Sequence, residues 1–255
     1  YTDLIHGAAD THWSGDKLSW LSQLIDGTRQ ILAFAQKTKV QRLLFLSSGA
    51  IYAPPPDGAL LKENQSQAPL STDISKLYAH GKRMAETICA LYSAQYGVPS
   101  VIARPFAVVS EHVPLDGPYA VGNFLRDALD PTRPNIVVRG NGQATRTYID
   151  GRDMAHWLLA MLDHGTPGTA YNLAGDQPIT TLALAELVAR IVSPGKPVQV
   201  EHQTEDLTQF DRLAYVPSVE RARSLGLVTQ MSLEESIAYA AHNIKYFRAK
   251  MGSET

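Results

Sequence analysis

The sequence predicts an α/β protein built on a parallel sheet. Strand-like and helix-like segments alternate regularly up to Pro105, and that order is typical of parallel strands joined by right-handed helical crossovers. The strand-like segments are also short and apolar throughout, as strands covered by helices on both faces should be. Beyond Pro105 the alternation loosens, which favours a second, smaller α/β part.

The first half of the chain contains three predicted strands and two predicted helices. "DLIHGAAD" opens as a buried strand, and a helix follows with its apolar residues at helical spacing. "RLLFLSS" (42–48) is the second strand, and residues 51–72 are rich in proline and glycine and predict a loop. A long helix over 75–96 ends at Gly97 and leads into the strand "PSVIARPF". The apolar face of the first helix is predicted to contain Leu18, Leu21, Ile25, Thr28, Ile31 and Ala35.

The second half is less regular. We predict helices near 122–129, 153–162 and 181–191, and strands at 135–139, "TRTYI" and "TAYNLAG". A turn is expected at "GNG", between the first two of these strands. "SLEE" (232–235) is a capping box, in which a serine and a glutamate satisfy each other's free amides, and it opens a final amphipathic helix.

Composition limits the classes of partner. A formal charge of -2 gives no reason to expect nucleic acid or an acidic membrane surface. No apolar run approaches the roughly 18 residues of a membrane span, and the first residues do not resemble a signal peptide. The single cysteine, Cys89, fits a reducing cytoplasm and is expected to be buried filler rather than a nucleophile.

Tyr78 and Lys82 are four residues apart in "LYAHGK", so a helix places them one above the other. A nearby lysine cation favours the phenolate, and a phenol with a lowered pKa can exchange a proton at a hydroxyl carbon. The spacing alone is a weak signal, because "YFRAK" repeats it at Tyr246 and Lys250. We interpret that second pair as solvated surface.

The context of Tyr78 strengthens the signal. "LFLSSGAIY" ends an apolar strand with Ser47 and Ser48, at the edge of a parallel sheet where ligands bind. A hydroxyl there can hydrogen-bond a substrate oxygen and relay its proton to a phenolate. The alternative for serines alone would be a simple strand-ending turn.

Several stretches together resemble the extended short-chain dehydrogenase/reductase family, specifically its nucleotide-sugar epimerase/dehydratase branch. The similarity follows the family's order through "LIHGAAD", "LFLSSGAIY", "YAHGK", "ARPF", "GNGQATRTYIDGRDMA" and "DRLAYVPSVERARSLGL", and it covers nearly the whole chain. It implies a Rossmann-like, doubly wound sheet with a C-terminal α/β substrate subdomain. The implied division assigns 1–108 to the NAD(P)-binding domain, with 151–175 returning to it, and 109–150 and 176–250 to the substrate subdomain.

The resemblance also implies roles for individual residues. Ser48, Tyr78 and Lys82 would be catalytic, with Tyr78 as the acid/base and Lys82 lowering its pKa and binding the nicotinamide ribose. Arg146 and Arg212 would bind the diphosphate of the substrate, as a planar guanidinium can. Cofactor contacts are expected from Ala8, Ala9, Ser47, Tyr78, Lys82 and Pro105.

The sequence departs from the family at its beginning. It contains no Gly-x-x-Gly-x-x-Gly turn between a strand and a helix, and "GNGQAT" lacks the third glycine. At about 30 residues per strand–helix repeat, we expect roughly 60 further residues ahead of Tyr1 in the natural protein. The residue that would select NAD or NADP would lie in that segment, so NAD is expected and NADP stays open.

Other departures concern chemistry. Where 4,6-dehydratases of the family have an Asp-Glu pair after the catalytic hydroxyl, this chain has Gly49 and Ala50, which cannot transfer protons. Ala107 replaces an asparagine of the "Arg-x-Phe-Asn" pattern, and Leu24 stands where an asparagine often precedes Gly-Thr. His6, Asp10 and His12 lack a fourth ligand, and we expect no metal there.

The residues and the resemblance lead to a functional expectation. We expect a C4 epimerase of a nucleoside-diphosphate sugar that acts through a 4-keto intermediate. An NAD(P)H-dependent 4-keto-sugar reductase is the alternative, and a non-catalytic nucleotide-binding protein is a third. Family resemblance further predicts a homodimer formed through the helices near 17–37 and 75–96.

Overall fold

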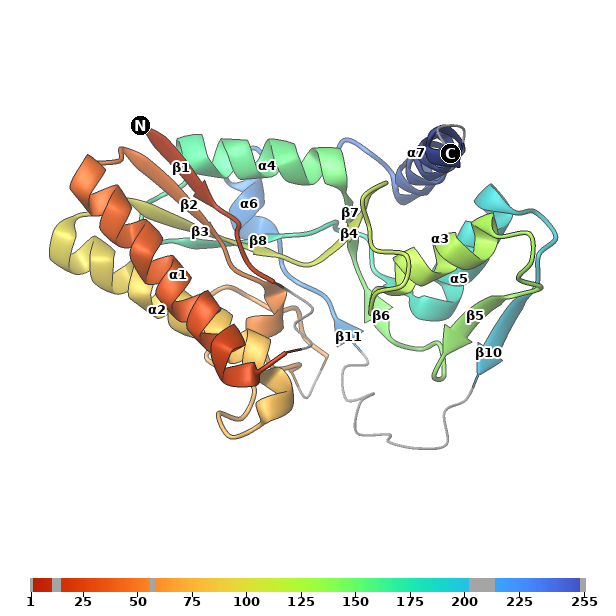
Figure 1. Ribbon diagram of the computed structural model, residues 1–255, viewed down its shortest axis with the longest axis horizontal. Helices are drawn as coiled ribbons and strands as arrows, with labels where there is room; N and C mark the ends of the chain where they lie inside the picture. Colours follow the sequence, from red (N-terminus) through yellow and green to blue (C-terminus); the bar gives the residue numbers. More distant parts are fainter. Residues whose placement is uncertain (1, 11–14, 56–57, 202–213, 253–255) are drawn as a thin grey trace.

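The computed structural model describes residues 2–10, 15–55, 58–201 and 214–252 (Figure 1). Two layered parts are visible, one around a central parallel sheet and one around the helices at the C-terminal end. None of the helices in the described ranges has the length and hydropathy needed to cross a membrane.

The central sheet is parallel and follows the order β1-β2-β3-β8. Its strands are β1 (Asp3–His6), β2 (Arg42–Leu46), β3 (Ser100–Pro105) and β8 (Ala170–Leu173). In register, Phe45 lies beside His6 on one side and Ile102 on the other. The predicted parallel α/β architecture is therefore confirmed.

Both faces of the sheet are covered, as side-chain alternation along β2 shows. Leu43 and Phe45 pack in one cluster with α1 (Lys17–Thr38) and α2 (Leu77–Tyr96). Leu44 points to the other face and packs with Trp157 of α4 (Gly151–His164) and Ala222 of α6 (Glu220–Arg223). Figure 1 shows α1 and α2 on one side of the sheet and α4 on the other.

The buried face of α1 agrees with the predicted one at Thr28 and Ala35 but differs elsewhere. Leu24, Thr28, Leu32 and Ala35 are buried, whereas Leu18 is 75% exposed. The helix packs against α2 as well as the sheet, which turns the buried stripe toward Leu24 and away from Leu18. Gly81 of α2 permits this contact, because a Cβ there would lie 2.6 Å from the Leu24 side chain.

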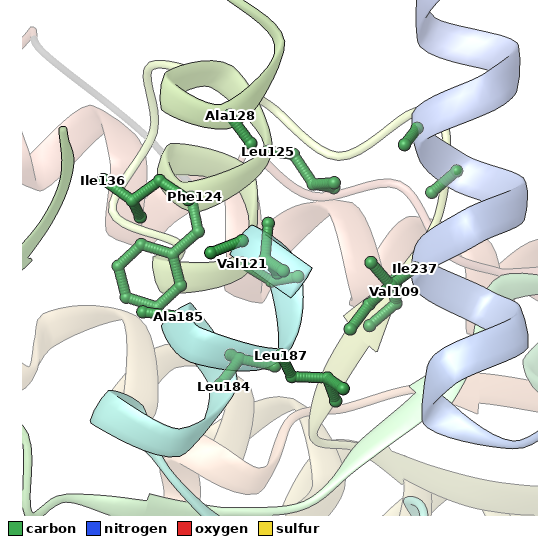
Figure 2. Packing of buried hydrophobic residues seen from close by; sticks show 14 of the residues in the cluster. Val109, Val121, Phe124, Leu125, Ala128, Ile136, Leu184, Ala185, Leu187 and Ile237 are labelled. Atoms are coloured by element: carbon green, nitrogen blue, oxygen red, sulfur yellow. The ribbon is translucent and has the colours of Figure 1, made fainter. Parts of the chain in front are cut away.

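A second core lies among α3 (Ala120–Leu129), α5 (Thr181–Val192) and α7 (Leu233–Gly252). Figure 2 shows the Phe124 ring of α3 beside Ala185 of α5, and Ile237 of α7 beside Val109. The strands β5 (Ile136–Arg139) and β10 (Val198–Glu201) pair in parallel at its edge. The division of the chain into two domains stays a prediction.

The stretch "TRTYI" is two strands and not one. β6 (Thr145–Arg146) pairs with β9 (Ile179–Thr180) and β11 (Ala214–Tyr215). After the buried Thr147, β7 (Tyr148–Asp150) pairs with β4 (Ala107–Val109). The single predicted strand is wrong because partners on the two sides of Thr147 come from different parts of the fold.

Local capping follows the sequence closely. Ser232 N donates to Glu235 Oε2 at 2.9 Å, and Glu235 N donates to Ser232 Oγ at 3.2 Å, so the predicted capping box is confirmed. Cys89 is 1% exposed, and burial raises the pKa of its thiol to about 12, which confirms its role as core filler.

Candidate active site

Ser47 and Ser48 continue β2 beyond its last hydrogen-bonded strand residue. The Ser47 amide donates to Ala103 O at 2.8 Å, which holds the chain in line with β3. Ser48 caps the 3₁₀ turn η1 (Gly49–Ile51), and its Oγ accepts from the Ala50 amide at 3.1 Å. Because Ser48 Oγ accepts this hydrogen bond through a lone pair, its own proton can still be donated to another group.

The Ser48 hydroxyl lies beside the phenol of Tyr78, and both line the same cavity. Tyr78 is the second residue of α2 and is half-buried, and it lines this cavity together with Ser47 and Ser48. Burial raises the pKa of Tyr78, and its side-chain contact with Ser48 acts in the opposite direction. The strand end and the helix start thus meet at one pair of hydroxyls, as the sequence predicts.

Lys82 lies one turn further along α2 and is 3% exposed. Its Nζ donates to Leu46 O at 2.7 Å, lies 5.0 Å from the centroid of the Phe45 ring and lies 5.9 Å from that of Tyr78. Burial lowers the pKa of Lys82 to about 8, against the opposing effect of the Glu86 carboxylate.

The pKa of Tyr78 bears on one expectation about the pair. The resemblance implies that Lys82 holds the pKa of Tyr78 below its ordinary value, yet that pKa is raised. Burial is the largest influence on the Tyr78 phenol in this structure, and the lowering of its pKa by Lys82 stays a prediction.

Two aromatic residues beside Tyr78 are absent from the sequence prediction. Trp20 of α1 stacks on the Tyr78 ring, with centroids 6.0 Å apart and planes at 20°, and its Nε1 donates to Asp10 O at 2.8 Å. Tyr119, which precedes α3, lines the same site. Both come from distant segments, so no local pattern in the sequence could associate them with Tyr78.

A cavity of about 760 Å³ opens from these groups toward the second core. Ser47, Ser48, Tyr78, Pro105 and Arg146 all line it, so the structure brings together most of the predicted site residues. Its size suits a drug-sized ligand.

Arg146 is positioned on β6 at the far side of this cavity. Its Nη1 donates to Thr145 O at 2.7 Å, and its guanidinium carbon lies 5.5 Å from the centroid of the Tyr215 ring. No carboxylate is among the described residues that line the cavity, whereas Arg146 supplies a permanent positive charge. The site is therefore electrostatically suited to an anion. Arg212, the other predicted diphosphate contact, lies outside the described residues.

Ala8 and Ala9 line a second cavity of about 810 Å³ between the end of β1 and α1. His6 also lines it, and its Nε2 lies 3.2 Å from Thr28 Oγ1. Burial and the Lys82 ammonium lower the pKa of His6 to about 4, so its ring is neutral. The sequence offers His6, Asp10 and His12 as potential metal ligands. His6 is hydrogen-bonded to Thr28, and His12 lies outside the described residues.

A buried polar network behind the cavity is also missing from the sequence prediction. Arg104 donates to both carboxylate oxygens of Glu86, at 3.0 and 2.7 Å, and to the Tyr52 hydroxyl at 2.6 Å. Tyr52 donates to Asn172 at 2.8 Å, and the Asn172 amide donates to Glu63 at 3.0 Å. This network ties α2, β3 and β8 to the loop that contains Glu63 and supports the end of β2.

The second Tyr-x-x-x-Lys pair has a different setting. Tyr246 lies on α7 with 57% of its surface exposed and makes an edge contact with Phe247. Its predicted place at the solvated surface is confirmed.

The fold and site define a parallel α/β protein with a serine, a tyrosine and a lysine converging beside a cavity at the carboxyl ends of the strands. The family model described as "NAD dependent epimerase/dehydratase family" matches residues 4–174, and the chain belongs to this family.

Curated relatives agree with this family. UDP-glucuronic acid decarboxylase 1 of Xenopus tropicalis is 26% identical over 227 residues, covering 88% of this chain and 51% of the relative. dTDP-D-glucose 4,6-dehydratase of Bos taurus is 26% identical over 243 residues, covering 92% of this chain and 65% of the relative. The chain thus spans about half to two thirds of the length of these relatives.

Solved structures show the same fold at lower identity. UDP-glucose 4-epimerase of Thermotoga maritima, solved with UDP-glucose, has a TM-score of 0.83 at 20% identity, over 98% of this chain and 78% of that one. UDP-glucuronic acid 4-epimerase of Bacillus cereus, solved with NAD, has a TM-score of 0.80 at 19% identity, over 96% and 75%.

Proposed function

We propose that the full-length protein is an NAD(P)-dependent enzyme that inverts C4 of a sugar carried on a nucleoside diphosphate. The observation that carries the proposal is that Ser48, Tyr78 and Arg146 line one cavity. The family description and the named 4-epimerases among similar structures support it.

Ser48 and Tyr78 would act on the C4 hydroxyl. The Ser48 hydroxyl polarises the C4 oxygen, and Tyr78 removes its proton as the carbon is oxidised and returns it afterwards. To accept this proton Tyr78 must be a phenolate, which re-forms when the proton is returned, and the Lys82 ammonium, 5.9 Å from the ring centroid, would stabilise that phenolate. The protein thereby supplies the proton path and the geometry.

The residues present fit a nicotinamide cofactor. Ser47 Oγ is buried and has no hydrogen-bond partner within the described part of the chain, and it lines the cavity together with Pro105. We propose that Ser47, Tyr78, Lys82 and Pro105 hold the nicotinamide end and that Ala8 and Ala9 contact the cofactor beyond it. When bound, NAD supplies the hydride acceptor and donor at C4.

The proposed substrate is an anion held by Arg146. A guanidinium binds a diphosphate through paired hydrogen bonds, and no carboxylate from the described cavity lining opposes the negative charge. Arg212 stays a predicted second contact.

The alternatives differ in the step after oxidation at C4. The 4,6-dehydratase and decarboxylase names among the relatives mean that epimerisation has competitors within the family. Gly49 and Ala50, immediately after Ser48, carry no titratable group, which disfavours elimination of water across C5 and C6. A 4-keto-sugar reductase would use the same Ser48 and Tyr78 but would consume a reduced cofactor stoichiometrically.

The decisive experiment is NMR analysis of the full-length protein with a panel of nucleotide sugars. We expect inversion at C4 without net consumption of cofactor. Stoichiometric oxidation of NADPH or NADH with a 4-keto sugar would instead favour the reductase. Loss of water or carbon dioxide would contradict both.

Tyr78→Phe tests the assigned acid/base. The substitution removes only the phenolic oxygen, so turnover should fall by about 10²- to 10⁴-fold while nucleotide-sugar affinity changes little. Tyr246→Phe is the matched control, because it removes the same oxygen from the exposed second pair, and it should be silent. Unchanged turnover in Tyr78→Phe would refute the assignment of Tyr78 as the acid/base, whereas absence of turnover by the wild-type protein would favour a non-catalytic binding protein.

A further inference from the structure

Tyr215 contacts Arg146 with its ring. It belongs to β11, which pairs in parallel with β6, and in that register Tyr215 is the direct partner of Arg146. Directly paired residues project their side chains to the same face of a sheet. The guanidinium carbon of Arg146 accordingly lies 5.5 Å from the centroid of the Tyr215 ring, within the range of a cation–π contact. The ring therefore supports the guanidinium.

The hydroxyl of Tyr215 reaches the turn that Ser48 caps. It donates to the carbonyl of Gly49, the first residue of η1. The next residue of this turn, Ala50, donates its amide to Ser48 Oγ at 3.1 Å. The phenol of Tyr215 thus holds the backbone on which the position of the Ser48 hydroxyl depends.

The Tyr215 ring is also packed on its remaining sides. It is 8% exposed and belongs to a buried cluster with Ile51, Tyr52 and Leu61. Its centroid lies 5.3 Å from that of Phe106, which lines the cavity. A side chain packed this closely has little freedom to move, so it holds Arg146 and the turn at the same time.

We propose that Tyr215 is a positioning residue that sets the separation between the Arg146 guanidinium and the Ser48 hydroxyl. Tyr215 lies behind the cavity lining, to which Ser48, Phe106 and Arg146 belong, so it acts on a ligand through those residues. The inference rests on the proposed function, in which Arg146 binds the diphosphate and Ser48 polarises the C4 oxygen. A nucleotide sugar bound at both ends brings C4 to Ser48 only when that separation is correct.

Tyr215→Phe removes the hydrogen bond to the Gly49 carbonyl and keeps the ring beside Arg146. We would measure kcat and KM of the full-length protein with the nucleotide sugar that the wild type converts fastest. The expected kcat is about 10-fold lower, because the Ser48 turn is released, whereas KM should change by less than about twofold. An unchanged kcat overturns the inference.

Tyr215→Leu removes the ring as well as the hydroxyl. The Arg146 guanidinium then loses its support, so affinity for a diphosphate should fall. The probe is UDP or dTDP, whichever the wild type binds more tightly by calorimetry. We expect a Kd about 5-fold higher in Tyr215→Leu than in Tyr215→Phe. Equal Kd values in the two variants also overturn the inference.

Tyr171→Phe is the matched control for a merely structural role. Tyr171 is 3% exposed, and its hydroxyl accepts from the Thr166 amide at 3.1 Å, so this variant also loses a buried hydrogen bond to the backbone. It should lower the urea midpoint of unfolding but leave kcat and the Kd for UDP or dTDP unchanged. If it lowers kcat as much as Tyr215→Phe does, Tyr215 has only a structural role.

The wild-type protein separates this inference from the proposed function. If the wild type inverts C4 and Tyr215→Phe keeps its full kcat, the inference fails while the proposed function stands. If the wild type converts none of the nucleotide sugars in the panel, the proposed function fails and the inference fails with it.

Discussion

At Ser48 one hydroxyl serves a backbone cap and a side-chain pair at the same time. Its oxygen accepts from Ala50 N, and its hydroxyl lies beside the Tyr78 phenol. Because the cap occupies an acceptor position, the orientation of the hydroxyl is set before any ligand arrives. Such preorganisation lowers the cost of aligning a proton path during reaction.

The protonation state of Lys82 should make kcat/KM depend on pH. Its pKa of about 8, lowered by burial, means that the ammonium loses its proton as pH rises through 8. The positive charge that stabilises the Tyr78 phenolate then disappears, so kcat/KM should fall above pH 8. The pKa of Tyr78 is raised by burial from its ordinary value of 10, which keeps its own titration above this range. The measurement is a pH–rate profile from pH 6 to 10.

Lys82→Arg is the matched variant for this prediction. A guanidinium stays protonated throughout that range, so the decline above pH 8 should vanish even if the absolute rate is lower. A decline that persists unchanged in Lys82→Arg would mean that another group titrates.

At the scale of elements, the ion pair between α2 and β3 fixes the helix that carries Tyr78 and Lys82. Glu86→Gln leaves the Arg104 guanidinium buried beside a neutral partner, and both side chains are only 11% exposed. Removing one charge of such a pair should lower the free energy of unfolding by about 3 kcal/mol. Urea unfolding of the full-length protein measures the change.

Asp26→Asn is the comparison on α1. It neutralises the carboxylate of an exposed pair with Arg29, at 3.4 Å, and should cost less than about 0.5 kcal/mol. If the two substitutions destabilise the protein equally, the buried pair does not brace α2.

How much of the fold and of the site the sequence predicts depends on how far apart in the chain the interacting residues lie. β2, α2 and β3 follow from local periodicity, and the Ser48–Tyr78 pair follows from the strand end and helix start that carry it. The stacking of Trp20 on Tyr78 and the Tyr52–Arg104 contact join segments far apart in the chain. No spacing of residues in the sequence indicates these contacts. The break at Thr147 has no local signal either, because each half of that segment pairs with a strand from elsewhere.

At the scale of the whole molecule, α1 and α2 present apolar side chains to solvent. Met84 and Leu91 of α2 are 49% and 51% exposed and lie two turns apart on one face, and Phe34 of α1 is 39% exposed. We propose that these helices form the expected homodimer, in which those side chains would be buried.

Leu91→Glu tests the dimer. A charge in an apolar helix interface should convert the full-length protein to a monomer in sedimentation velocity runs. Leu159→Glu places the same charge on α4, where Leu159 is 59% exposed, and should leave the dimer intact. A monomeric wild-type protein, or dissociation by both variants, would contradict the proposal.

The split of residues 145–150 into β6 and β7 has a mechanical consequence. Arg146 belongs to the small sheet beside the second core, while Asp150 caps α4, which packs on the central sheet. A ligand bound by both Arg146 and Ser48 would therefore connect the two cores across their junction. Binding of such a ligand would also restrict motion at the junction, and a more rigid junction would in turn raise the affinity for the ligand.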